Sequence, residues 1–205
     1  MKRLLTLSLA ALLAAALTGC GARGAKPVIY LYPEEETQVS VTLELDGTFT
    51  STYPDYGEGW TVTAAPDGTL TDPETGRTYY CLFWEGIIDR QFDLSAGFCV
   101  AGEDTAAFLE DALARLGLTE REANEFIIYW LPRMEGNPYN LISFQTDAYT
   151  DAAELTIAPA PDTLIRVFMT RKGLEQPVEI PAQELTAPTR TGFTAVEWGG
   201  AELGK

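Results

Sequence analysis

The sequence predicts an α+β fold: a β-dominated single domain of largely antiparallel sheets, with one short two-helix insertion at about residues 104–125. Two observations lead to this prediction. Short runs rich in β-branched and aromatic residues, separated by turn residues, fill most of the chain after residue 27. Helical spacing and helix-capping residues gather in one stretch near the middle.

The first part of the domain, residues 27–100, is expected to form successive strands. The clearest is residues 38–45, QVSVTLEL, in which aliphatic side chains alternate with polar ones and share one face. Asp46-Gly47 then turns the chain, and a strand over residues 59–63 follows. Further turns precede a strand over residues 77–84. This half is therefore predicted to be an antiparallel meander.

The two predicted helices follow. Apolar residues at helical spacing begin after Asp104, the expected N-cap, and Gly117 marks the end of the first helix. Thr119 and Glu122 have the spacing of a capping box, which begins the second. That helix is expected to be short, because residues 126–131, FIIYWL, favour a strand by composition. Later strands are predicted over residues 140–145, 155–158, 164–170 and 193–198.

The first twenty residues have the three regions of an export signal. Lys2 and Arg3 precede an uncharged apolar stretch over residues 4–17, and small residues follow up to Cys20. The apolar stretch is shorter than the about 20 residues that a membrane-spanning helix needs. The segment LTGC at residues 17–20 resembles the lipobox of bacterial lipoproteins, which implies a diacylglyceryl group on Cys20 and cleavage just before it. An ordinary secretory signal cleaved elsewhere is the alternative.

This interpretation divides the chain into a signal peptide (1–19), a short lipid-anchored tether (20–26), one globular domain (27–199) and a tail (200–205). Two or more acyl chains, such as palmitate, hold a protein stably at a bilayer. We therefore expect a lipoprotein at the cell membrane, anchored through Cys20 and facing the extracytoplasmic side.

Composition excludes several classes of function. Removal of residues 1–19 takes away two of the 14 basic residues and none of the 30 acidic ones, so the mature chain has a formal charge of −18. Such a surface repels phosphate backbones, and we expect no nucleic acid partner. The chain has no histidine, which excludes a Ser-His-Asp triad and histidine-ligated zinc. We expect no metal and no cofactor.

Cys81 and Cys99 remain in the mature chain besides Cys20. A disulfide between them is permitted outside the cytoplasm. The alternative is two buried thiols, which the aromatic and aliphatic neighbours of both cysteines favour slightly.

Glu85 and Glu197 are the candidate catalytic residues, because each adjoins a tryptophan at the end of a predicted strand. Apolar neighbours raise a carboxyl pKa and can create a general acid, while a second carboxylate acts as base or nucleophile. Glu125 is a third carboxylate that could share such a cleft. The pattern suits a glycosidase-like hydrolase. The alternative, which we favour, is that these are solvated side chains on the opposite face of each strand from its tryptophan.

A turn region carries Asp67, Asp72 and Glu74, which crowd oxygen atoms into a short loop of the kind that calcium favours. The spacing does not fit an EF-hand. Two ordinary turns, in which aspartate accepts backbone hydrogen bonds, account for these residues better.

The aromatic residues suggest a recognition surface, because flat rings with polar edges suit sugar faces and protein partners. The candidates are Tyr30, Tyr32, Tyr53, Tyr56, Trp60, Trp84, Tyr129, Trp130, Tyr139 and Trp198. Half or more are expected in the core. We predict ligand contacts from Trp84, Trp198 and a Gly- and Pro-containing loop that carries Arg133, Asn137 and Tyr139.

Four segments together resemble a family of uncharacterised lipoproteins and secreted proteins of gut Firmicutes. They are KPVIYLYP at residues 26–33, LFWEG at 82–86, YWLPRMEGNPYN at 129–140 and VEWGG at 196–200. The resemblance implies a single domain and a Gram-positive host, and it implies no activity. The sequence thus favours a non-catalytic binding or envelope-associated lipoprotein, with a glycan or another envelope protein as partner. A carboxylate-dependent hydrolase of the envelope is the alternative.

Overall fold

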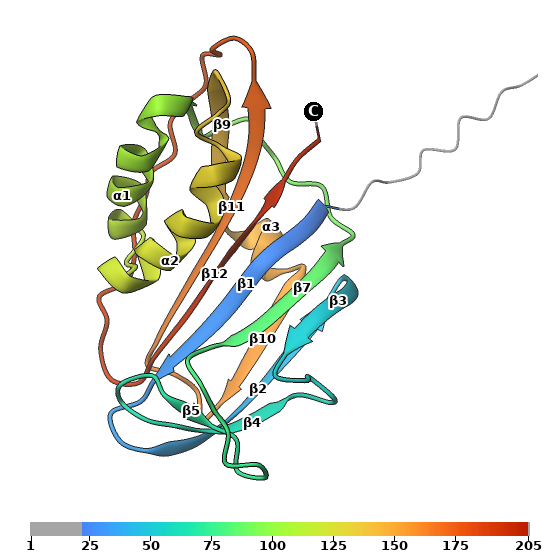
Figure 1. Ribbon diagram of the computed structural model, residues 1–205, viewed down its shortest axis with the longest axis vertical. Helices are drawn as coiled ribbons and strands as arrows, with labels where there is room; N and C mark the ends of the chain where they lie inside the picture. Colours follow the sequence, from blue (N-terminus) through green and yellow to red (C-terminus); the bar gives the residue numbers. More distant parts are fainter. Residues whose placement is uncertain (1–21, 205) are drawn as a thin grey trace, which may run out of the picture.

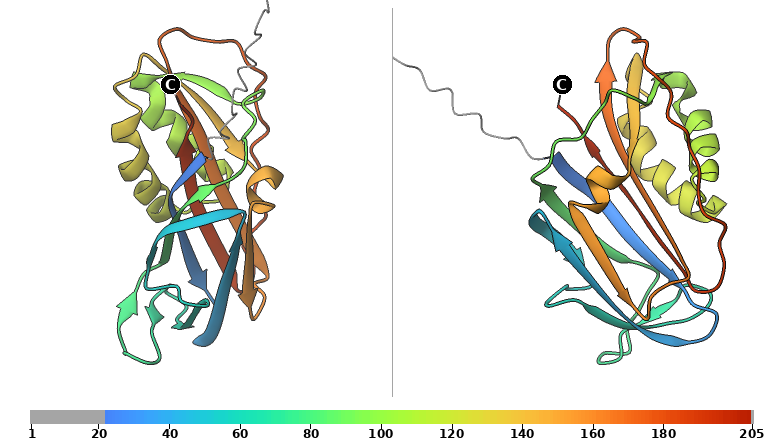
Figure 2. Two further views of the ribbon diagram at one scale, coloured as in Figure 1. Left: turned by 90° about the vertical axis from the view of Figure 1, so that its right-hand side faces the viewer. Right: turned by 180° about the vertical axis from the view of Figure 1, so that it is seen from behind.

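The structure is a computed structural model that describes residues 22–204, and it confirms the α+β fold class. A larger and a smaller β-sheet lie face to face, and two helices cover the other face of the larger sheet (Figure 1). Seen from behind, the smaller sheet lies on the side away from these helices (Figure 2). The layers are therefore helices, larger sheet and smaller sheet.

The larger sheet has the strand order β3-β7-β1-β12-β11-β9-β8. Its strands are β1 (Ala22–Tyr32), β3 (Gly47–Tyr53), β7 (Leu82–Ile88), β8 (Phe98–Ala101), β9 (Tyr139–Gln145), β11 (Thr163–Leu174) and β12 (Thr194–Glu202). Neighbours are antiparallel, except that β11 and β12 run parallel. The first and last strands of the described chain, β1 and β12, thus pair near the centre of the sheet (Figure 1).

The smaller sheet has the strand order β10-β2-β4-β5-β6. Its strands are β2 (Thr37–Leu45), β4 (Trp60–Ala64), β5 (Leu70–Thr71), β6 (Thr78–Tyr79) and β10 (Ala153–Ala158). The predicted alternation is present in β2, where Val39, Val41 and Leu43 are buried and their neighbours are exposed.

The predicted meander is right only for β2, β4, β5 and β6, because β1, β3 and β7 belong to the larger sheet. The chain crosses between the sheets at Gly47, whose φ is 152°. A Cβ there would lie 1.9 Å from the carbonyl oxygen of Ile87, so the crossing requires glycine.

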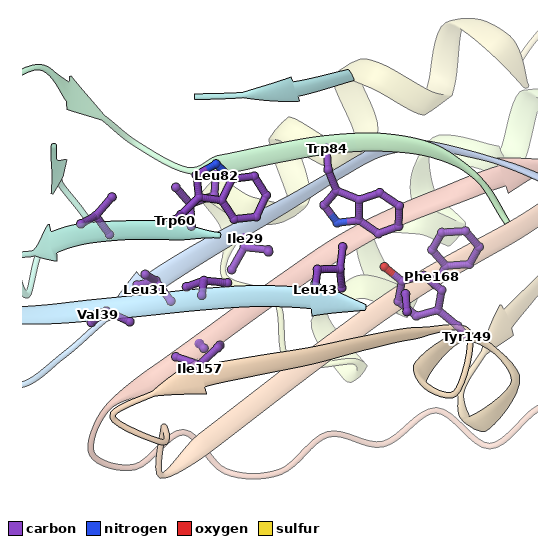
Figure 3. Close-up of a cluster of buried hydrophobic side chains, with 14 of the residues drawn as sticks. Ile29, Leu31, Val39, Leu43, Trp60, Leu82, Trp84, Tyr149, Ile157 and Phe168 are labelled. Carbon is purple, nitrogen blue, oxygen red and sulfur yellow. The ribbon is translucent and has the colours of Figure 1, made fainter. Parts of the chain in front are cut away.

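The core between the two sheets contains the side chains that β1 and β2 point toward each other. Ile29 and Leu31 of β1 pack with the aliphatic residues of β2 and with Trp60 and Trp84 (Figure 3). Because side chains alternate along a strand, Val28 and Tyr30 of β1 point the other way, toward the helices.

The helices are α1 (Thr105–Arg115) and α2 (Glu120–Trp130), flanked by the 3₁₀ turns η1 (Gly102–Asp104) and η2 (Leu131–Arg133). Asp104 is the N-cap residue of α1, but its side chain makes no capping hydrogen bond. Gly117 ends α1 with a φ of 85°, and the amides of Gly117 and Leu118 donate to the carbonyls of Ala114 and Leu113 in a Schellman motif. The predicted capping box of Thr119 and Glu122 is present.

The predicted strand over residues 126–131 is wrong, because α2 continues to Trp130. Phe126 and Trp130 lie one turn apart and are both buried, whereas Ile128 between them is 74% exposed. Helical spacing therefore prevails over the strand propensity of this segment, and the two-helix insertion extends beyond residue 125.

The second core lies between the helices and the larger sheet. Its members include Leu109, Leu113, Phe126, Trp130, Val196 and Trp198, all of which are buried. The short helix α3 (Asp147–Thr150) lies outside this layer and brings Tyr149 into the first core.

The folded domain begins earlier in the chain and ends later than the predicted bounds of residues 27 and 199. Residues 22–26, the expected tether, form the start of β1 and pair with both β7 and β12. Residues 200–202, the start of the expected tail, belong to β12. Small residues such as Ala22 and Gly24 give no alternation of polar and apolar side chains, which is why both ends were missed.

The predicted signal peptide and Cys20 lie outside the described residues. Within residues 22–204, no helix is both long enough and apolar enough to span a membrane.

A segment without regular structure, residues 175–193, connects β11 to β12 and runs past the edge of the larger sheet and the helices (Figure 2). Its Pro181 carbonyl accepts a hydrogen bond from the amide of Gly97 at 2.8 Å. The side-chain amide of Gln183 donates to, and accepts from, the backbone of Phe144 in β9. These contacts fix the segment against the sheet and bring Arg190 to α2.

Candidate functional site

The outer face of the larger sheet is covered by helices over only part of its width. The helix-side core includes residues of β1, β12, β11, β9 and β8, and the same face continues uncovered onto β7 and β3. Several large aromatic and apolar side chains on or beside this uncovered part are exposed to solvent. Tyr53 is 51% exposed, Tyr80 is 52% exposed and Ile87 is 43% exposed. Their gathering on one face makes this surface a candidate for ligand binding, because contiguous exposed apolar and aromatic side chains mark interaction sites.

Two hollows lie along the boundary between the helices and this uncovered face. One, of about 410 Å³, includes Tyr30, Tyr32 and Arg190 in its lining, and the other, of about 370 Å³, includes Lys26, Tyr53 and Phe83. Tyr80 lines both hollows, so the two hollows adjoin at this residue. We call the two hollows together the tyrosine groove.

Five of the nine tyrosines in the chain line the tyrosine groove. They are Tyr30, Tyr32, Tyr53, Tyr79 and Tyr80. Tyr30 and Tyr32 are two positions apart on β1 and therefore share a face, where their rings stack with centroids 6.2 Å apart. The ring centroids of Tyr80 and Tyr30 are 6.4 Å apart, and the rings of Tyr53 and Tyr79 pack edge to face with their centroids 5.5 Å apart. The exposed rings of Tyr53 and Tyr80 are thus supported by contacts with other tyrosines, of which Tyr30 is itself buried.

Two carboxylates of helix α2 lie directly behind the lining of the groove and contact its polar residues. Glu122 and Glu125 lie three positions apart and so project from one side of the helix. The Tyr30 hydroxyl donates to Glu125 at 2.8 Å, and the Arg121 guanidinium lies 3.6 Å from the same carboxylate. Arg190 forms an ion pair with Glu122. Each of these two carboxylates is therefore matched by a guanidinium.

The tyrosine hydroxyls of the groove are kept protonated by their surroundings. Burial, reinforced by the hydrogen bond to Glu125, raises the pKa of Tyr30 far above its usual range. Burial and the nearby Glu122 raise the pKa of Tyr32 in the same way. Burial, with a smaller contribution from Cys81, raises the pKa of Tyr80 to about 12. These hydroxyls act as neutral hydrogen-bonding groups at physiological pH.

Glu197, a predicted catalytic residue, lies far from this surface. It is 0% exposed in the core between the two sheets, where it accepts hydrogen bonds from Arg166 at 2.7 Å and from the Trp84 indole at 3.1 Å. Glu85 alternates with Trp84 along β7 and therefore points to the opposite face of the sheet. Its carboxylate accepts a hydrogen bond from the Lys26 amide at 3.3 Å. The larger sheet thus separates the two carboxylates, and they cannot share one cleft.

The predicted ligand contacts of the two tryptophans are also wrong. Trp84 and Trp198 are both 0% exposed, each in one of the two cores. The sequence signal was ambiguous, because an indole beside a glutamate fits a strand that is buried on both faces as well as a binding surface.

The loop after α2 is ordered by its own polar contacts. Arg133 is exposed and stacks on the Tyr129 ring, with 3.9 Å between the guanidinium carbon and the ring centroid. The Asn137 side chain donates to Asn140 at 2.7 Å, and Tyr139 is half-buried at the start of β9. Asn137 therefore shapes the loop, and of the three predicted contacts only Arg133 is openly accessible.

The two described cysteines are free thiols, so of the two alternatives that the sequence left open the disulfide is not formed. Cys81 directly precedes β7, and Cys99 lies in β8. Five strand spacings of about 4.8 Å separate these strands in the sheet, which is far beyond the reach of a disulfide. Burial raises the pKa of the Cys81 thiol to about 12, so this residue is no thiolate nucleophile.

The turns that carry Asp67 and Asp72 are stabilised by hydrogen bonds from backbone amides to these aspartates. The Asp67 carboxylate accepts from the amide of Thr69 at 2.9 Å, and Asp72 accepts from the amides of Glu74 and Thr75. These hydrogen bonds lower the pKa values of both aspartates. Within residues 22–204, no three potential ligands among Cys, Asp and Glu lie close enough to hold a metal ion.

Sequence reasoning missed several groove residues. Tyr79, Tyr80, Arg121 and Arg190 were not among the candidates, and they come from segments far apart in the chain. The adjacent pair of tyrosines directly after a polar turn region was the one local signal that could have indicated an exposed platform.

Comparison with known proteins finds a relative of part of the chain. Over 85 residues the chain is 44% identical to a protein of Butyrivibrio fibrisolvens named "Uncharacterized protein in bglA 3'region". The match covers 37% of this chain and 86% of that protein. No family model and no solved structure matches the chain.

Proposed function

We propose that this chain, which belongs to the same family as the Butyrivibrio fibrisolvens protein, is a membrane-anchored extracytoplasmic lipoprotein that binds a ligand in the tyrosine groove without converting it. The ligand is a glycan or another protein of the cell envelope. The observation that carries this proposal is the concentration of five tyrosines, two of them about half exposed, around two adjoining hollows.

Anchoring rests on the lipobox-like segment that ends in Cys20. Because β1 begins at Ala22, a single residue separates the acylated cysteine from the first residue of the sheet. The domain is therefore held close to the bilayer. The acidic surface of the chain is not attracted to anionic lipid headgroups. The acyl chains alone therefore hold the protein at the membrane.

Binding without catalysis is supported by the chemistry of the groove. Glu122 forms an ion pair with Arg190, and Glu125 forms one with Arg121 and also accepts the hydrogen bond of Tyr30, so both carboxylates are already engaged by side chains of the protein. Glu85 and Glu197 lie on opposite faces of a sheet, and the Cys81 thiol is protonated. The hydrolase alternative required carboxylates that converge in one cleft, and Glu85 and Glu197 do not. Glu85 and the third candidate, Glu125, both adjoin the tyrosine groove, so Glu125 is included in the test of catalysis below.

Detergent phase partition of membranes labelled with a radioactive lipid precursor tests the anchor. The wild-type chain is expected in the detergent phase and labelled, and the Cys20→Ala chain is expected in the aqueous phase and unlabelled. Label in the Cys20→Ala chain would contradict the anchor.

Incubation with fluorescently labelled cell envelopes tests binding without conversion. The wild-type chain is expected to sediment with the envelopes and to release no soluble fluorescence. Release of soluble fragments, lost in a Glu125→Gln variant, would show that the groove is an active site instead.

A further inference from the structure

We infer that the tyrosine groove binds a neutral, linear polysaccharide, with sugar rings in both hollows and one ring against Tyr80. This inference rests on the proposed function, because it names the ligand of the same site. Three properties of the groove support it: its balance of charge, the pairing of its polar groups and the meeting of its two hollows at one aromatic residue.

The groove is balanced in charge although the chain is strongly acidic. Its basic residues are Lys26, Arg77, Arg121 and Arg190. The carboxylates that line or adjoin it are Asp67, Glu85, Glu122 and Glu125. Of these carboxylates only Asp67 is in the lining; Glu122 and Glu125 lie behind it and pair with Arg190 and Arg121, so the groove has no excess of negative charge, in a chain with 30 acidic and 14 basic residues. An anionic polymer would meet no net attraction in the groove and would be repelled by the surrounding surface.

The polar groups of the groove suit hydroxyl groups. A hydroxyl both donates and accepts hydrogen bonds, so it is best met by paired donors and acceptors. The Arg121–Glu125 pair provides both kinds, and the Tyr30 hydroxyl is fixed in place by its bond to Glu125. Charged groups that are already paired are also less costly to desolvate when a neutral ligand covers them.

The shape of the groove favours a sugar chain over a protein partner. Hollows of about 410 and 370 Å³ are at the lower end of the range of small-ligand pockets, about 300–1,000 Å³. A stable protein partner needs a broad contact surface of about 800 Å² instead. Because both hollows share Tyr80 in their lining, a ligand that fills both must extend past this residue as a continuous chain. A single sugar ring fills only one hollow.

Affinity electrophoresis tests this inference. The full-length chain, in detergent micelles, is run through gels that contain a neutral β-glucan, a neutral mannan or a uronic acid polymer. Retardation is expected in at least one neutral gel and not in the uronate gel. An oligosaccharide of the retarding polymer is expected to bind at least about tenfold more tightly than its monosaccharide, measured by titration calorimetry.

Variants at Tyr80 show whether the groove is responsible. Tyr80→Ala is expected to weaken binding by about tenfold or more, whereas Tyr80→Phe retains the ring and most of the affinity. Ile128→Ala is the matched control, because Ile128 is an exposed apolar residue on the outer side of α2, away from the groove lining. Circular dichroism and melting temperature verify that the variants are folded.

The outcomes separate this inference from the proposed function. Retardation in the uronate gel alone, or equal affinity for monosaccharide and oligosaccharide, would overturn the inference. No retardation in any gel, with sedimentation on isolated envelopes still lost in Tyr80→Ala, would also overturn the inference but leave the groove as a binding site. If Tyr80→Ala changed neither measurement, the proposed function would fail as well.

Discussion

Replacement of Glu197 by glutamine tests whether this residue is structural, as its surroundings indicate. Glu197 is fully buried, and its partner Arg166 has a side chain that is 8% exposed. Arg166 also donates to the carbonyl of Ala153 at 2.7 Å and lies 4.8 Å from the centre of the Tyr149 ring. Burial alone would lower the pKa of Arg166, but Glu197 and Tyr149 raise it on balance. The Arg166 guanidinium therefore stays charged in the folded protein.

The size of the effect follows from the charge that remains. Glu197→Gln retains the shape and the acceptor for Trp84 but leaves the Arg166 guanidinium buried without a counter-ion. Breaking such a pair costs about 3–5 kcal/mol, a large part of the about 5–15 kcal/mol that stabilises a domain. For a chain of this size the loss lowers the melting temperature by about 6–20 °C.

Urea unfolding followed by tryptophan fluorescence measures this loss. Glu154→Gln, a change at an exposed position on β10, is the control and is expected to stay within about 0.5 kcal/mol of the wild type. The double variant Arg166→Met with Glu197→Leu is expected to recover much of the stability, because it removes both buried charges. If Glu197→Gln were as stable as the control variant, the reasoning that Glu197 is a structural counter-ion would be refuted.

Two further predictions concern local features. Thr119→Ala removes the side-chain acceptor for the amide of Glu122 at the start of α2, and a loss of about 1 kcal/mol is expected in the same urea assay; an unchanged midpoint would contradict the capping role. Alkylation without reductant, followed by mass spectrometry, is expected to modify Cys99 faster than Cys81 at pH 8, because Cys81 is buried and its thiol has a pKa of about 12. The alkylation of Cys81 is expected to accelerate as the pH rises toward that value. A mass two hydrogens short, with neither of these thiols modified, would instead indicate a disulfide between them.

The fold could be predicted as far as local patterns determine it. Alternation in β2 and the capping box at Thr119 are properties of a few neighbouring residues, and both are present in the structure. The strand predicted over residues 126–131 failed because its intrinsic preference opposes the helical spacing of Phe126 and Trp130. The packing of those two rings against the larger sheet makes this segment helical. Such packing cannot be inferred from a few neighbouring residues of the sequence.

The candidate site was harder to predict, because it depends on which face of the sheet each strand turns outward. Glu85 and Glu197 look equivalent in sequence, each beside a tryptophan, yet β7 turns Glu85 toward the helix side and β12 turns Glu197 toward the smaller sheet. The expectation that both carboxylates are solvated is therefore wrong for Glu197. Its side chain is buried on the face of the larger sheet that also carries Trp84. Only the pairing of strands decides which face a side chain takes.

The course of β1 relates the proposed anchor to the proposed ligand. The strand begins at Ala22, beside the predicted lipid-bearing Cys20, and carries Lys26, Tyr30 and Tyr32 toward its other end. At about 3.3 Å per residue, the tyrosine pair lies roughly 25–35 Å along the strand from the anchored end. The hollow that holds Lys26 is nearer to the anchored end, and the hollow that holds Tyr32 is farther from it. A polymer chain bound across Tyr80 would therefore run along β1, from the hollow nearer to the anchored end of the strand to the hollow farther from it.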